Sequence, residues 1–179
     1  MVARFRRRAL LPFNVNANQV EYADWPYWVD QLTGEQIGND ADHWNDCGPA
    51  CLVATRLWRT GEIWVPDQIR DTMYWDGYRG YTTTTKLVEF VKSVWQWPAS
   101  ETTYTFTELR SHVATWLYEK VCVIILTKEP AGYNHFTVIT GMTDTGIVRY
   151  NSLGGKREEL SWDELRQRFI NWAVVMPVP

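Results

Sequence analysis

Two short segments carry side chains that could act together in nucleophilic catalysis. The first, residues 45–50, precedes apolar residues at helical spacing, so Cys47 should lie where a helix begins. Unpaired backbone N–H groups and the helix dipole favour a thiolate at such an end. Gly48 leaves room for a substrate backbone, and Pro49 fits the first turn of a helix. A buried thiol beside an ordinary helix cap is the alternative explanation.

The second segment provides a candidate base. His135 begins the alternating run 136–141, which predicts a half-buried strand, and the turn at 143–146 predicts a hairpin. In such a hairpin Asn151 lies within about three residues of the position opposite His135. An imidazole beside an amide on the next strand is the geometry of a base held in one tautomer. A satisfied strand histidine and a turn-forming asparagine are the alternative, but the cysteine at a helix start favours catalysis.

The remaining histidines and cysteines indicate no second kind of chemistry. His43, Cys47 and Cys51 form a regularly spaced series, but structural zinc sites use four ligands and commonly closer cysteine pairs. The sequence has no zinc-protease, P-loop or dinucleotide-binding motif, so we expect neither a metal nor a cofactor. His112 should lie at the surface of a helix, and Cys122, inside an apolar run, should be a core thiol. Three cysteines exclude a complete disulfide framework.

The composition is that of one folded domain. The chain has 179 residues, of which 45% are hydrophobic and 22% charged. Its net charge of −3 argues against nucleic-acid binding. Four arginines mark residues 1–20 as a basic, irregular arm before a domain at 21–179, and membrane-surface or partner docking is the alternative role of this arm. The sequence shows neither a secretory signal nor a membrane-spanning run, so a cytoplasmic location is the default expectation.

Helical patterns precede strand patterns along the chain. Helices are predicted from Cys47, from Pro66, through the apolar stripe Leu87, Phe90, Val91, Val94 and Trp95, and after capping boxes at Thr105–Glu108 and Ser161–Glu164. Strands are predicted over residues 121–126, 135–141, 147–151 and 172–176. This order predicts an α+β domain with two layers around one core.

The catalytic segments resemble those of papain-like cysteine peptidases, specifically the bacteriocin-leader-processing type (cysteine peptidase family thirty-nine) and its soluble relatives. The matching pieces are residues 45–50, 135–141 and 150–153, and the resemblance extends from near Trp25 to the C-terminus. It implies a papain-like α+β fold, in which an N-terminal helical half carries the cysteine helix and packs on a C-terminal antiparallel sheet.

The resemblance also implies a catalytic triad. Cys47 would be the nucleophile, His135 the general base and then the general acid, and Asn151 the residue that orients the imidazole. Many relatives carry aspartate at the third position, so Asn151 is a departure toward the arrangement seen in papain. An amide at this position orients the imidazole without a full negative charge.

The oxyanion donor is less well marked. Residues 25–31 resemble the Pro-Tyr-x-x-Gln segment of soluble relatives, and this resemblance identifies Gln31, whereas the closest family pattern has its glutamine where this chain has Ala41. His43 or Asn45 would supply the donor if Gln31 does not. The residues expected to contact the substrate are Trp44, Gly48 and Asn134.

These residues predict a thiol hydrolase that cleaves a peptide or amide bond. One substrate is a peptide, and another is cell-wall peptide, as for a peptidoglycan amidase or endopeptidase with the same triad. A catalytically silent papain-like module that binds a peptide or a partner is an alternative, and so is transglutaminase-like acyl transfer. The 11 tryptophans would form stacking platforms for an extended substrate or, more commonly, fill the core and its boundary.

Overall fold

The structure is a computed structural model that describes residues 20–27, 29–31, 45–74 and 81–178. The predicted basic arm lies outside the described residues except for its last residue, Val20. In chain order the elements are β1 (Val20–Glu21), α1 (Cys47–Thr60), α2 (Pro66–Met73), α3 (Thr84–Ser93), β2 (Ser100–Thr103), α4 (Phe106–Tyr118), β3 (Cys122–Lys128), β4 (Asn134–Thr143), β5 (Gly146–Asn151), β6 (Lys156–Ser161), α5 (Trp162–Arg168) and β7 (Phe169–Met176).

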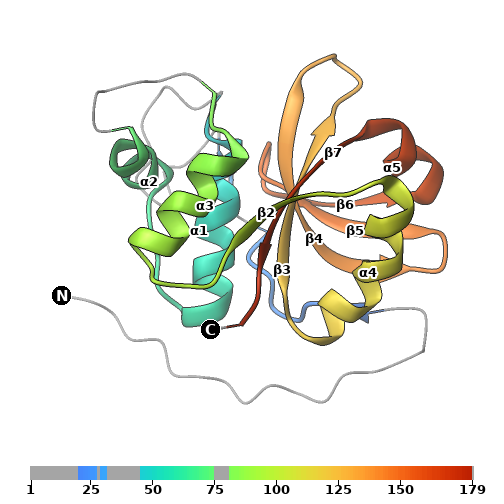
Figure 1. The fold of residues 1–179 in the computed structure, drawn as a ribbon, viewed down its shortest axis with the longest axis horizontal. Helices are drawn as coiled ribbons and strands as arrows, with labels where there is room; N and C mark the ends of the chain where they lie inside the picture. The colour runs from blue at the N-terminus through green and yellow to red at the C-terminus, as the bar shows by residue number, and fades with distance from the viewer. Residues whose placement is uncertain (1–19, 28, 32–44, 75–80, 179) are drawn as a thin grey trace.

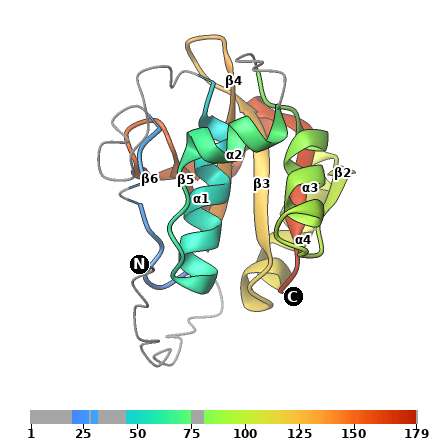
Figure 2. The same ribbon diagram turned by 90° about the vertical axis from the view of Figure 1, so that its left-hand side faces the viewer.

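One antiparallel sheet of seven strands forms the centre of the described part of the chain. Its order is β2-β7-β3-β4-β5-β6, and β1 pairs with β4. Figure 1 shows α1, α2 and α3 on one side of the sheet and α4 and α5 on the other. Figure 2 looks onto the side that the first three helices cover. The predicted α+β fold, with a helical half packed on an antiparallel sheet, is confirmed. No helix in the described ranges is both long enough and apolar enough to cross a membrane.

Helix α1 forms as its apolar periodicity predicts, but its first turn is not stabilised by an ordinary side-chain cap. Val53 is completely buried, and Gly61 ends the helix with a φ of +73°, donating its N–H to the Leu57 carbonyl at 2.8 Å. Asp46 occupies the N-cap position, yet its side chain makes no capping hydrogen bond. It instead pairs with Arg70 of α2, and both side chains are buried. The start of α1 is therefore fixed by a tertiary ion pair.

Several elements differ from the sequence prediction at their edges. Helix α3 ends at Ser93, so Val94 leaves the predicted buried stripe and is 39% exposed. Strands β2 and β6 give no strand signal in the sequence because they are polar and lie at the two ends of the sheet, where burial is partial. Both predicted capping boxes, at Thr105 and at Ser161, are present.

The core is built mainly from aromatic and β-branched side chains between the helices and the sheet. Cys122 is completely buried on β3, as predicted for a core thiol, and His112 is exposed on α4. The described tryptophans mostly lie in the core or at its boundary, while Trp172 is 41% exposed. The buried tryptophans are Trp25, Trp95, Trp97 and Trp116. Their burial supports the interpretation of most tryptophans as core residues.

Candidate active site

Cys47 is the first residue of α1 and lies half-buried at the tip of the helix. Burial raises the pKa of its thiol above the ordinary value, while backbone hydrogen bonds involving Phe136, Gly48 and Cys47 itself oppose this shift. Burial thus acts against the thiolate that the helix terminus favours. Cys51, one turn further along α1, is completely buried, and burial raises the pKa of its thiol as well.

The predicted hairpin brings His135 and Asn151 together. Strands β4 and β5 pair antiparallel with Asn151 opposite Thr137, two positions beyond His135 and on the same face of β4. The His135 Nε2 atom lies 2.8 Å from Asn151 Oδ1, and both side chains are buried. Asn151 ends β5, and the turn that follows it continues into residues that approach Gln31.

The contacts of the Asn151 amide fix the tautomer of His135. Asn151 Oδ1 also accepts from the backbone N–H of Leu153 at 2.9 Å, and Asn151 Nδ2 donates to Glu158 Oε2 at 3.0 Å. If the amide of Asn151 were flipped, its NH₂ group would face the Leu153 N–H, which is also a donor, and its oxygen would face the Glu158 carboxylate. Only the unflipped orientation therefore satisfies all partners. His135 Nε2 must then carry the hydrogen, which leaves Nδ1 as the basic nitrogen.

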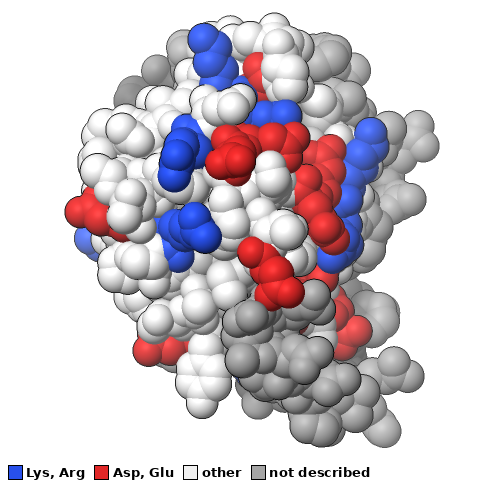
Figure 3. Space-filling model, turned by 90° about the vertical axis from the view of Figure 1, so that its right-hand side faces the viewer, with Lys and Arg blue, Asp and Glu red and all other residues white. Residues whose placement is uncertain are grey.

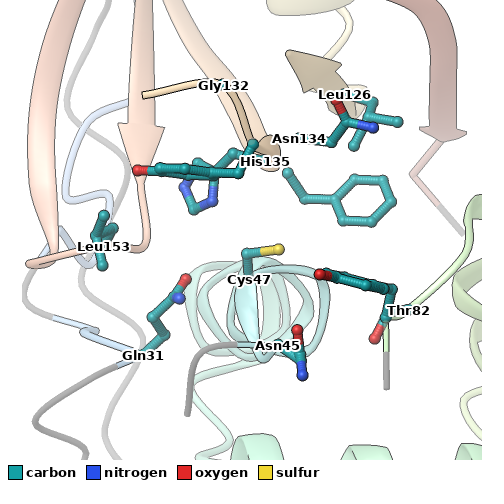
Figure 4. A pocket seen from close by; sticks show the side chains of 12 residues that line it. Gln31, Asn45, Cys47, Thr82, Leu126, Gly132, Asn134, His135 and Leu153 are labelled. Atoms are coloured by element: carbon teal, nitrogen blue, oxygen red, sulfur yellow. The ribbon is translucent and has the colours of Figure 1, made fainter. Parts of the chain in front are cut away.

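A pocket of about 530 Å³ joins the thiol and the imidazole. Figure 4 shows the imidazole of His135 extending into this pocket above the tip of α1, where Cys47 lies, and shows the Cys47 sulfur turned toward the Thr82 side. The Tyr133 ring meets the His135 ring edge to face, with their centroids 6.1 Å apart. The lining residues are Gln31, Asn45, Cys47, Tyr81, Thr82, Leu126, Gly132, Tyr133, Asn134, His135, Phe136 and Leu153, none of which carries a permanent charge.

The predicted oxyanion donor lies at the same pocket. Gln31 is buried, its backbone N–H donates to the Ser152 carbonyl at 2.9 Å, and its Oε1 accepts from the Ser152 hydroxyl at 2.6 Å. This second bond turns the amide nitrogen of Gln31 away from Ser152, and an oxyanion needs that nitrogen as donor. Asn45, the alternative donor, also lines the pocket, whereas His43 lies outside the described residues.

The three residues predicted to contact substrate differ in their positions relative to the pocket. Asn134 is exposed at the start of β4 and lines the pocket. Gly48 is buried, and a Cβ there would lie 3.2 Å from the side chains of Leu87 and Thr82, so a larger residue would require these neighbours to shift slightly. Trp44 lies outside the described residues. Within the described ranges, no group of three potential metal-ligating side chains occurs.

The structure contains an ionic cluster behind the triad that the sequence analysis did not predict. Arg149 is buried and contacts Glu129 and Glu158, the carboxylate that accepts from Asn151. Glu158 and Glu159 are neighbours in the polar strand β6. The structure directs Glu158 toward Arg149 and Glu159 to the opposite face of β6, a difference that the polar sequence of this strand does not reveal.

Comparisons with known proteins show which solved structures share this fold. No family profile and no curated protein matches the sequence. Several solved structures are similar in fold, among them the following three. One is a double glycine motif protease from an AMS/PCAT transporter, in complex with the leader peptide: 18% identity, TM-score 0.56, covering 74% of this chain and 84% of that one.

The second is a protein of Bacillus anthracis described as a C39-like peptidase, with 14% identity and a TM-score of 0.64, covering 90% of this chain and 98% of that one. The third is the peptidase domain of Streptococcus ComA, a bi-functional ABC transporter involved in quorum sensing, with 16% identity and a TM-score of 0.58, covering 75% of this chain and 93% of that one. This chain therefore has the α+β papain-like fold of C39 (cysteine peptidase family thirty-nine) domains.

Proposed function

We propose that this protein is a cysteine peptidase that cleaves a peptide or amide bond through a covalent acyl-enzyme. The observation that carries the proposal is the shared pocket of Cys47, at a helix tip, and the hydrogen-bonded pair His135–Asn151. The fold adds support, because a protease of similar fold was solved with a leader peptide bound. The uncharged lining of the pocket suits a neutral stretch of peptide.

The reaction begins with proton transfer from the Cys47 thiol to Nδ1 of His135. This requires the sulfur to turn from the Thr82 side toward the imidazole, a rotation between staggered positions about the Cα–Cβ bond. The thiolate then attacks the carbonyl carbon of the substrate, and the C=O π electrons move onto oxygen. The oxyanion accepts hydrogen bonds from the backbone N–H of Cys47 and the side-chain amide of Gln31.

Collapse of the tetrahedral intermediate releases the amine. Its nitrogen leaves with the C–N bond electrons and takes the proton from His135 Nδ1, which leaves a thioester on Cys47. Water then gives a proton to Nδ1 and attacks the thioester carbon. The C–S bond breaks, and the sulfur recovers the proton from the imidazole. Throughout, the bond to Asn151 keeps Nε2 protonated and holds the ring in place.

The resting protonation state follows from burial. Desolvation lowers the pKa of His135 and raises that of Cys47, so burial favours the neutral form of both groups before substrate binds. The neutral pair favours general-base activation of the thiol at the moment of attack over a stored thiolate–imidazolium pair.

The test uses purified protein with two substrates, a peptide containing Gly-Gly and peptidoglycan. Cleavage of either one, lost in Cys47→Ala and kept in Cys51→Ala, is the expected result. The substrate that is cut distinguishes a peptidase from a cell-wall amidase or endopeptidase, and added amines test for acyl transfer. Equal cleavage by wild type and Cys47→Ala would overturn the proposal. Binding of the peptide without cleavage would favour a silent peptide-binding module.

A further inference from the structure

The orientation of Asn151 depends on a residue of the next strand. Asn151 Oδ1 faces His135 Nε2 and the Leu153 N–H, and Asn151 Nδ2 donates to Glu158 Oε2 at 3.0 Å. Strand β6 pairs with β5 so that Glu158 lies opposite Arg149, two residues from Asn151 on the same face of β5. The sheet register thus places a carboxylate directly behind the amide that holds the imidazole.

Glu158 is itself fixed by a buried arginine. Its Oε2 accepts from Arg149 Nη2 at 2.7 Å and from Arg149 Nε at 3.1 Å. On its other side Arg149 contacts Glu129 at 2.7 and 3.1 Å, and Thr127 at 3.4 Å. Arg149 is 2% exposed and Glu158 is 32% exposed, so the pair is only partly screened by water. The carboxylate cannot turn away without breaking contacts with both Arg149 and Asn151.

This arrangement is unlike the ordinary surface ion pairs of the same strand. Glu159, the next residue, pairs with Arg157 at 2.9 Å, and both side chains are exposed. Acidic and basic side chains lie next to one another over the face of the molecule shown in Figure 3. Loss of one exposed charge from such a mixed surface is therefore expected to change little. Glu159 provides a matched control for Glu158.

We propose that Glu158 is a positioning residue of the active site, which holds the Asn151 amide toward His135 and supplies the negative charge that an aspartate in the third triad position would otherwise provide. The proposal rests on the proposed function. It extends the triad outward into a chain from His135 through Asn151 to Glu158, anchored by Arg149. The charge favours the imidazolium that forms when Cys47 is activated.

Other charged groups also act on the imidazole and set the sign of the test. The titratable or charged groups that face this region are Glu129 after β3, Arg149 on β5, Glu158 on β6, Tyr133 before β4, Cys47 on α1, and Arg168 on α5, which lies 3.7 Å from Glu129. The two glutamates raise the pKa of His135 and Arg149 lowers it. Removing the charge of Glu158 should therefore make His135 less basic.

The experiment compares Glu158→Gln with Glu159→Gln in the full chain. The imidazole pKa of His135 is followed by NMR of protein labelled at histidine, assigned with His135→Gln, and the rate of Cys47 alkylation by iodoacetamide is followed across pH. Turnover of a cleaved peptide gives kcat and KM. In Glu158→Gln we expect a lower pKa of His135 and about a tenfold lower kcat with KM unchanged, and no change in Glu159→Gln.

A reciprocal exchange separates positioning from mere folding. In Asn151→Asp two carboxylates would meet, and kcat should fall. In Asn151→Asp with Glu158→Gln, the charge and the amide have exchanged places, so the pKa of His135 and most of kcat should return. This double variant decides the matter even if Glu158→Gln does not fold.

Two results would overturn the inference: a pKa of His135 in Glu158→Gln equal to that in Glu159→Gln, or a folded double variant that regains nothing. Failure of the proposed function looks different. In that case wild type and Cys47→Ala behave alike with every substrate, while the NMR comparison still reports whether Glu158 acts on His135.

Discussion

Replacing Arg70 tests whether a buried ion pair holds the nucleophile's helix in place. Arg70, on α2, pairs with Asp46, the residue before Cys47, and the two side chains are 1% and 0% exposed. In Arg70→Met the carboxylate of Asp46 remains in the interior without its guanidinium. Breaking one partner of such a buried pair costs about 3–5 kcal/mol in the free energy of unfolding, because the remaining charge is uncompensated.

The assay is urea unfolding followed by tryptophan fluorescence at pH 7, with the free energy of unfolding extrapolated to water. Lys86→Met is the matched control, because Lys86 and Glu89 form an exposed pair at 3.1 Å and its loss should cost about 0–1 kcal/mol. Adding Asp46→Asn to the Arg70→Met variant should recover part of the lost free energy of unfolding. A cost for Arg70→Met no larger than that of the control would refute the reasoning.

Three further predictions concern the cap of α4, the buried imidazole and the β5–β6 pairing. Thr105→Ala should lower the free energy of unfolding by about 1 kcal/mol, because the hydrogen bond that caps α4 is lost. Thr115→Ala, at an exposed site of the same helix, should not lower it. Equal effects of the two substitutions in urea unfolding would contradict the assignment of the cap. Burial lowers the pKa of His135 from 6.5, so the unfolded chain binds a proton that the native state does not, and stability should fall as pH drops below 6.5. His135→Gln should flatten this dependence, and parallel curves for the two proteins would count against it. Gly146→Ala should cost about 1–3 kcal/mol because its Cβ would overlap the Leu160 carbonyl oxygen, and an unchanged urea midpoint would show that the strands can separate without loss.

The sequence alone determined the features that depend on short-range pattern. The helix start at Cys47, the capping boxes at Thr105 and Ser161, and the hairpin that joins His135 to Asn151 all follow from the spacing of apolar, turn and capping residues. Each of these signals is contained within about one element or one hairpin, so a single sequence is enough to detect it.

Only the tertiary structure decided the features that depend on distant partners and on burial. Asp46 pairs with Arg70 instead of capping its own helix, and Gln31 is oriented by Ser152 across 121 positions. The raised pKa of Cys47 comes from desolvation in the packed cleft, which local sequence does not encode. Glu158 reaches Asn151 through the register of an edge strand whose polar sequence resembles a solvated surface. Desolvation and long-range pairing are properties of the assembled layers, so they become visible only when the helices and the sheet are placed together.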